Sequence, residues 1–182
     1  MPTLDMPPFP TLTSGYCSWE GIFDLRTWIG FPMPRVGQAT ESSPLSSDGS
    51  IDLRVEWYGR DPVPPSCEQS AGFAYLLLHE ELATDSVLTA IFQQYPRIRE
   101  HTLNDYRHAS IADLPEITHP DQLRPLLGVP TVHVLVASRD GLAYVGFEFE
   151  PVWENDHGLG VMTHRSHFVE IGPAETAFLR AS

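Results

Sequence analysis

The sequence predicts an α+β fold: an antiparallel sheet with a helical pair and a short third helix packed on one face. Three observations lead to this class. Strand-like stretches lie in the first and last thirds of the chain, helical periodicity is confined to the middle, and the last third alternates like a β meander. A separation of strand runs from helix runs is typical of α+β domains, in which the sheet is antiparallel.

The chain has 182 residues, the length of a single domain. Residues 1–14 hold four prolines and show little periodicity, so they are expected to form an extended Pro-rich arm. Residues 15–182 are expected to form a single α+β domain. Within it, the aromatic and β-branched residues of the stretch 16–31 predict one or two strands. The strict alternation from Ile51 to Trp57 predicts a half-buried strand.

The helical pair is predicted from a start signal and from periodicity. Ser66 and Gln69 have the S-x-x-Q spacing of a capping box, which predicts a helix to about Leu82. Thr84 or Asp85 is expected to cap the second helix, whose apolar residues keep helical spacing up to a proline at position 96 that stops or kinks it. The short third helix is predicted over residues 120–127, with a proline in its first turn and a glycine closing it.

The last third of the chain predicts two β-hairpins. The first joins residues 132–137 to 142–150 through an Asp-Gly turn, which is a strong hairpin signal. The second joins residues 160–164 to 167–172 around Arg165-Ser166. These strands would complete the sheet.

The charge balance restricts the possible partners. Twenty-four carboxylates oppose eleven cations, all of them arginine, for a net charge of −13. Nucleic-acid and anionic-membrane binding both rely on basic surfaces, so neither partner is expected. A basic protein partner, a bound cation or plain solubility remain open. Cys17 and Cys67 are too few for a disulfide framework, and no apolar stretch has the length of a signal or a membrane span, so a cytoplasmic protein is expected.

Histidines and carboxylates are concentrated between residues 148 and 170. If Arg165-Ser166 is a two-residue turn, His164 and His167 face each other across the ladder with Cβ atoms about 4.5–5.5 Å apart. Two imidazoles at that separation can share a metal, to which His157 would add a ligand, together with Asp156 or Glu154. The alternative is an exposed turn without a ligand, and the lack of H-E-x-x-H and C-x-x-C motifs favours it.

The stretch from Trp153 to Val161 reads W-x-x-x-H-G-L-G-V, and it is flanked by the strands predicted on either side. With the stretches Trp19-Glu20-Gly21 and Trp28 to Phe31, it resembles an uncharacterised bacterial family, one of the numbered families of domains of unknown function. The resemblance covers most of residues 16–178. It implies an α+β domain in a cytoplasmic protein, and it implies no activity, cofactor or catalytic residue.

The resemblance and the residue pattern together select a candidate binding or structural motif. Its residues are Trp153, Asp156, His157, Gly158 and Gly160. The two glycines predict backbone angles that a side chain would forbid, or a close approach by another backbone segment. A tight corner without a ligand is the alternative explanation of this motif.

Three functions remain in competition. The first is a non-enzymatic acidic protein-binding module without a cofactor, of which an immunity-type inhibitor is one form; the absence of a catalytic signature favours it. The second is a metal-binding protein or metal-dependent hydrolase that uses His157, His164 and His167. The third is a structural domain whose acidity reflects habitat or coding bias. Whether the protein is an enzyme, and its oligomeric state, stay open.

Overall fold

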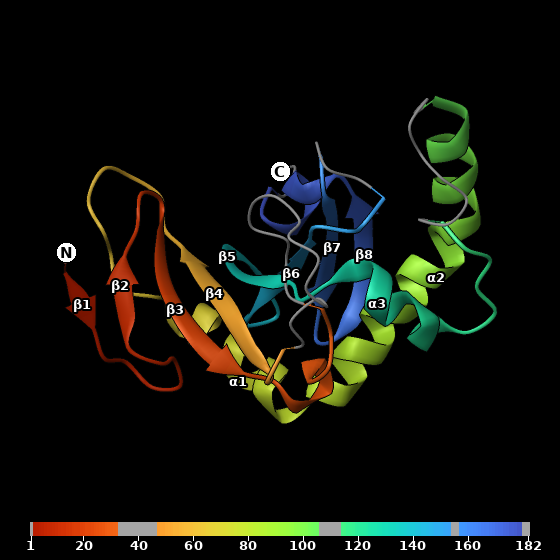
Figure 1. Cartoon of the computed structure of the whole chain (residues 1–182). Helices are drawn as coiled ribbons and strands as arrows, with labels where there is room; N and C mark the ends of the chain where they lie inside the picture. Colours follow the sequence, from red (N-terminus) through yellow and green to blue (C-terminus); the bar gives the residue numbers. More distant parts are fainter. Residues whose placement is uncertain (1, 33–46, 106–113, 154–156, 180–182) are drawn as a thin grey trace, which may run out of the picture.

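The computed structural model describes residues 2–32, 47–105, 114–153 and 157–179. Its eight strands form one sheet in which they follow one another in sequence order (Figure 1). The α+β class predicted from the sequence is confirmed. The strands are β1 (Thr3–Leu4), β2 (Leu12–Ser14), β3 (Ser18–Asp24), β4 (Ser50–Glu56), β5 (Thr131–Arg139), β6 (Leu142–Phe149), β7 (Leu159–His164) and β8 (His167–Gly172).

One pair of neighbours departs from the antiparallel pattern. β4 and β5 are parallel, with Leu53 opposite Val132, whereas the other neighbouring pairs are antiparallel. Parallel neighbours need a long crossover, because the chain must return to the same end of the sheet. The segment between β4 and β5, which contains the helices, makes that return.

The Pro-rich N-terminal segment turns back on itself between β1 and β2, and both strands are built into the sheet. β1 pairs with β2, and β2 pairs with β3. Leu12 is fully buried, and the ring of Phe9 stacks on Phe73 with the ring centroids 4.9 Å apart. Residues 2–14 therefore contribute core side chains.

The helices are α1 (Cys67–Leu78), α2 (Glu80–Asp105) and α3 (Arg124–Leu127), with short 3-10 turns η1 (Arg26–Trp28), η2 (Pro120–Leu123) and η3 (Ala174–Ala177). The capping box that starts α1 is present, with Ser66 and Gln69 bonded reciprocally. Gln69 also donates to the carbonyls of Glu56 and Val134, at 2.8 and 3.2 Å, which fixes the start of α1 against β4 and β5.

The prediction of the second helix was wrong in its start, and the alternative in which Pro96 stops the helix was wrong as well. α2 begins at Glu80, directly after the break at His79, so neither Thr84 nor Asp85 is a cap. Thr84 lies inside the helix, where its hydroxyl is 2.8 Å from the hydroxyl of Thr27. The helix also continues through Pro96 to Asp105.

Tertiary contacts explain why α2 passes Pro96. A proline in a helix removes one backbone hydrogen bond and crowds the preceding turn. Next to it, the Tyr95 side chain is buried, and its hydroxyl donates to the Pro115 carbonyl at 2.9 Å. Four residues after Tyr95, the Arg99 guanidinium donates to the Leu114 carbonyl at 2.8 Å. These two hydrogen bonds offset the free-energy cost of a proline inside the helix.

The two faces of the sheet are covered differently. On β6, Ala143 faces α1, where Gly72 lets the helix approach the strand backbone. Gly146 is three residues further along the strand and therefore faces the opposite side, where the backbone of η3 lies against it. The main core lies on the α1 side and includes Trp28, Phe147 and Phe149.

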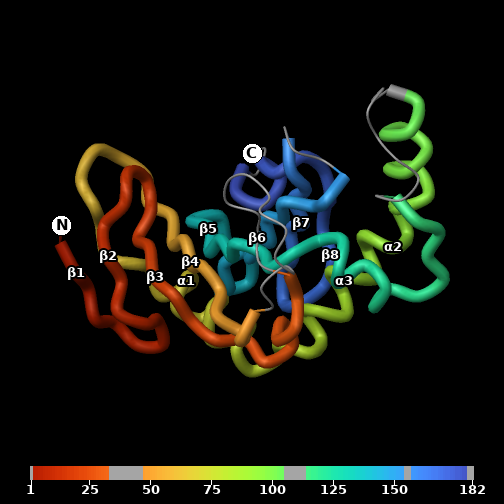
Figure 2. Tube along the Cα trace, viewed as in Figure 1, coloured from red at the N-terminus to blue at the C-terminus, as the bar shows by residue number. Residues whose placement is uncertain are grey.

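α2 lies beside the β8 edge of the sheet, and its C-terminal turns extend beyond the strands (Figures 1 and 2). The N-terminus lies at the opposite end of the molecule, next to β1 (Figure 2). Among the helices that the structure describes, none combines the length and the apolar character of a membrane span.

Candidate functional site

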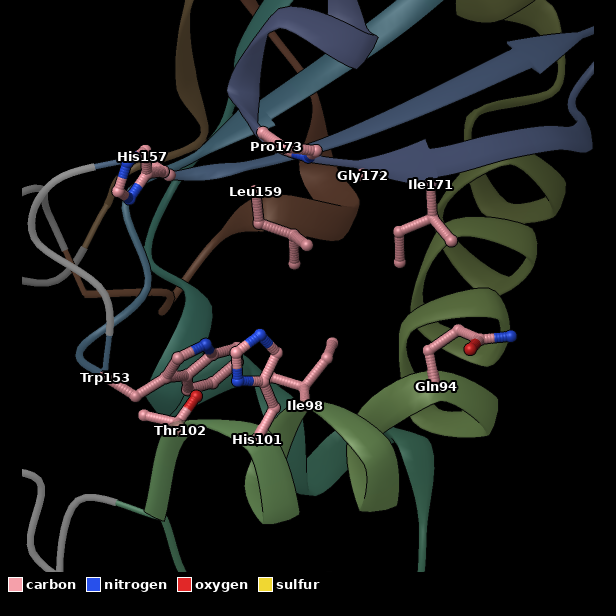
Figure 3. Close-up of a pocket in the computed structure, with 11 residues that line it drawn as sticks. Gln94, Ile98, His101, Thr102, Trp153, His157, Leu159, Ile171, Gly172 and Pro173 are labelled. Atoms are coloured by element: carbon pink, nitrogen blue, oxygen red, sulfur yellow. The ribbon is translucent and has the colours of Figure 1, made fainter. Parts of the chain in front are cut away.

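Side chains of α2 and of the β7–β8 region enclose a pocket of about 500 Å³ (Figure 3). This volume is in the range of ligand-binding pockets. Three residues of the candidate motif line it: Trp153, His157 and Gly158. The remaining lining residues are Gln94, Ile98, His101, Thr102, Leu159, Ile171, Gly172 and Pro173.

The corner around His157 is built by the backbone, as the glycine spacing predicts. Gly158 has a φ of +61°, in the left-handed region that favours glycine. The His157 carbonyl accepts a hydrogen bond from the Ala174 N–H at 2.9 Å. A Cβ on Gly160 would come within 2.6 Å of both the Pro173 carbonyl oxygen and the Ala177 nitrogen, so Gly160 supports the corner without lining the pocket. Asp156 lies outside the described residues.

The wall opposite this corner comes from α2 (Figure 3). Leu159 and Ile171 point from the strands toward α2 (Figure 3), and Trp153 and His101 line the same pocket. Trp153 is held by an edge-to-face contact with Tyr95, with ring centroids 5.6 Å apart. The pocket thus combines an apolar lining with polar groups at its margins.

A second pocket, of about 320 Å³, lies nearer the N-terminus of α2 and the start of β8. Its apolar side chains are partly exposed: Leu82 by 45% and Phe168 by 44%. The residues that line it are Leu82, Asp85, Ser86, Thr89, Ala90, Gln93, His167 and Phe168.

The two pockets follow one another along α2. Their α2 residues run from Leu82 to Thr102, and the row that links them steps by four residues and so winds around the helix. The smaller and the larger pocket therefore lie against different faces of α2, over a stretch of helix about 30 Å long. We call the two sets of lining residues together the α2–β8 groove.

Acidic residues surround the N-terminal end of the groove. Asp85 is exposed on its wall, and Glu81 is exposed next to Leu82. Glu80 and Glu81 lie in the first turn of α2, where negative charge also interacts favourably with the helix dipole. Glu170 is also exposed on β8, but it is adjacent to Ile171 in the strand and therefore faces away from the groove. Apolar side chains with an acidic surround are therefore presented to solvent here.

The three histidines proposed as metal ligands are not brought into one group. His164 and His167 do pair across the turn as predicted, and both turn residues have positive φ. The His164 imidazole, however, donates from Nε2 to the Arg139 carbonyl at 2.9 Å and packs against the Tyr144 ring. His157 precedes β7, whereas His164 ends it, which separates them by roughly 20 Å of extended chain.

Within the described residues, no group of three His, Cys, Asp or Glu side chains has a metal-binding arrangement. Glu154 and Asp156, the carboxylates named as further ligands, lie outside those residues. The metal site therefore stays a prediction from the sequence.

Sequence reasoning missed the closest His–carboxylate pair in the described structure. His133 is 3% exposed, and its Nε2 donates to the Glu148 carboxylate at 2.8 Å. The Phe178 ring covers the imidazole, with ring centroids 5.0 Å apart. The hydrogen bond from His133 is the main cause that lowers the pKa of Glu148, and the charge of Arg54 contributes to the same shift. The only sequence signal was a histidine that interrupts the apolar run of β5.

Glu56, at the end of β4, is the carboxyl with the most strongly raised pKa among those described. Burial raises its pKa to about 7, although its carboxylate accepts a 3.4 Å hydrogen bond from the Val136 N–H. Desolvation disfavours the charged form of a carboxyl, and one weak hydrogen bond does not compensate. Glu56 does not line either pocket of the groove.

Comparisons with known proteins identify a family and nothing more specific. The family model described as "Domain of unknown function (DUF6985)" matches residues 32–179. The matched region contains the whole α2–β8 groove, whereas β1, β2 and β3 precede it. Neither the curated proteins nor the solved structures contain a significant match.

Proposed function

Because the chain belongs to the DUF6985 family of domains of unknown function, we propose a function from its geometry: a non-enzymatic module that binds a segment of a basic protein partner in the α2–β8 groove. The observation that supports this proposal best is the succession of two pockets along α2, each with a wall from β8. A single recess would suit a small ligand, whereas a groove about 30 Å long suits a stretch of polypeptide.

The exposed apolar residues favour binding over a purely structural role. Leu82 and Phe168 lie across the groove from each other on α2 and β8, and each leaves more than two fifths of its surface in water. Leu78, at the end of α1, is 79% exposed. Clustered exposed apolar residues beside polar ones are a common feature of protein interaction sites.

The chemistry of the lining favours binding over catalysis. Among the described residues, the larger pocket has no carboxylate or thiol in its lining, and its titratable groups are the imidazoles of His101 and His157. The His133–Glu148 pair has the geometry of an acid–base couple, but His133 is buried and Phe178 covers it. General acid–base work requires a group within reach of a substrate.

The partner's charge follows from the charge of the module. A net charge of −13, with Glu81 and Asp85 at one end of the groove, attracts a basic partner and accelerates its encounter. If the partner is an enzyme and its active-site segment enters the groove, the complex is inhibited. That is the action of an immunity-type inhibitor.

The experiment is capture of a partner from a lysate of the source cells, made with three matched baits. The first is the unaltered protein, the second carries Leu82→Ser with Phe168→Ser, and the third carries Ile22→Ser. Ile22 is a suitable control because it is 62% exposed but lies on β3, outside the groove.

A partner retained by the unaltered bait and by the Ile22→Ser bait, but lost from the groove variant, supports the proposal. The retained partner should be basic, and raising the salt concentration from about 0.05 M to 0.5 M should release it, because screening weakens the attraction. Equal retention by all three baits, or retention of nothing even at low salt, contradicts the proposal.

A further inference from the structure

We propose that the partner segment binds in an extended conformation and adds to the sheet as a ninth strand, paired with the exposed edge of β8. This inference rests on the proposed function, since it specifies how the partner occupies the α2–β8 groove. It assigns the main-chain groups of β8 as a binding site for a polypeptide backbone.

β8 is the end strand of the sheet and has the exposure of an edge that can be paired. Its first four residues, 167–170, are all exposed. In the part of the chain that the structure describes, β7 is the strand that pairs with β8. Successive N–H and C=O groups of a strand point to alternate sides, so about half of those in β8 face away from β7. The opposite edge, β1, has only two residues.

The pockets of the groove would select the side chains of a strand that pairs with this edge. Phe168 and Ile171 of β8 line the smaller and the larger pocket, respectively, so both pockets lie along the strand. In an added strand, every second side chain, about 7 Å apart, would point to the α2 side. Backbone pairing would then supply affinity, and the pockets would select apolar side chains at alternate positions.

A second copy of this chain is a poor occupant of the edge. Two copies carry −13 each and repel one another. The register between β7 and β8 skips Val169, so a strand that pairs with this edge must accommodate one bulge there. The occupant with complementary charge is a different chain, with apolar residues on one side of the strand and basic residues on the other.

The test uses three synthetic peptides of the same sequence, in which arginine alternates with valine. One peptide is unmodified. In each of the other two, every other backbone nitrogen is methylated, which removes the N–H groups of one edge and leaves the charges and side chains unchanged. Binding of fluorescently labelled peptide to the full chain is followed by anisotropy at low salt. We expect the unmodified peptide to bind and the one methylated on its β8-facing edge to bind about tenfold more weakly or worse.

Two methylation patterns, one for each edge of the peptide, complete the design. Strand addition predicts that one pattern abolishes binding and the other is tolerated. Equal binding of all three peptides, or binding of none, overturns the ninth-strand inference. The proposed function fails separately: it is contradicted if the captured partner binds the Leu82→Ser, Phe168→Ser variant as tightly as it binds the unaltered protein.

Discussion

Two regions at the sheet carry histidines and polar groups. They differ in how far other parts of the chain cover their side chains. On the outer face of the sheet, the His133–Glu148 pair is closed off by Phe178 and η3; we call this region the covered face. In the α2–β8 groove, Leu82 and Phe168 remain exposed by 45% and 44%. The stability of the fold accounts for the contacts of the covered face. It does not account for the exposed apolar side chains of the groove.

The difference is that the His133–Glu148 pair has an explanation in the stability of the fold. Buried polar groups need partners, because an unsatisfied group costs about 1–3 kcal/mol. The His133–Glu148 hydrogen bond meets that requirement. Exposed apolar side chains gain nothing from remaining in water, and the proposed binding of a partner segment would bury Leu82 and Phe168.

The largest effect is expected where the covered face is closed by backbone contact. In Gly146→Ala, the new Cβ would overlap the Ala177 carbonyl, so η3 must move or β6 must bend. We expect a loss of about 3 kcal/mol in the free energy of unfolding, measured by denaturant titration. An unchanged unfolding midpoint would show that η3 is not fixed against the sheet.

The next effect concerns the charge on Glu56. Its pKa is raised to about 7 in the folded protein, from 4.5, so the folded state binds the proton more tightly than the unfolded state does. Stability therefore falls as pH rises from 4.5 through 7. Glu56→Gln removes this loss, and we expect the variant to be more stable than the unaltered protein by about 2 kcal/mol at pH 8.

The same comparison made at pH 4 supplies the control for Glu56. There both forms are neutral at this position, so the two unfolding free energies should coincide. A stability difference that does not change between pH 4 and pH 8 would rule out a raised pKa as its cause.

A smaller effect of opposite sign is expected at Glu148. Its pKa is lowered, chiefly by the hydrogen bond from His133, so the ionised carboxylate stabilises the fold above pH 4.5. Glu148→Gln should cost about 1–2 kcal/mol at pH 7, and the cost should shrink as pH falls below 4.5 through the lowered pKa. A cost that persists undiminished at low pH would indicate a packing defect instead.

The smallest effect on stability is expected in the groove. Leu82→Ser and Phe168→Ser each remove a side chain that is already partly in water, so each should change the free energy of unfolding by about 1 kcal/mol or less. Thermal unfolding of the two single variants measures this. A loss as large as that of Gly146→Ala would mean that these residues belong to the core.

Local sequence signals predicted the elements that depend on residues close to one another in the sequence. The alternation from Ile51 to Trp57 predicted β4, and the Ser66–Gln69 spacing predicted the start of α1. As their spacing indicated, Gly158 has a left-handed φ, and Gly160 lies in close contact with another backbone segment. Each of these depends on neighbours within a few residues, or on the absence of a Cβ.

The sequence could not predict the elements that depend on distant contacts. α2 continues through Pro96 because Tyr95 and Arg99 bond to carbonyls of a segment fifteen to twenty residues away. Since the helix was expected to end or bend at that proline, the far half of the groove wall was not anticipated. Trp153, His157 and Gly158 of the candidate motif line the larger pocket, whose α2 residues the sequence analysis did not select.

The most direct test of the central claim is a hydrogen-exchange footprint of the complex with the captured partner. The account predicts slower amide exchange in α2 from about Leu82 to Thr102 and along β8, with β1–β3 unchanged. Protection concentrated on β1–β3, or on the covered face around His133, with α2 and β8 exchanging as in the uncomplexed protein, would contradict the assignment of the α2–β8 groove as the binding site.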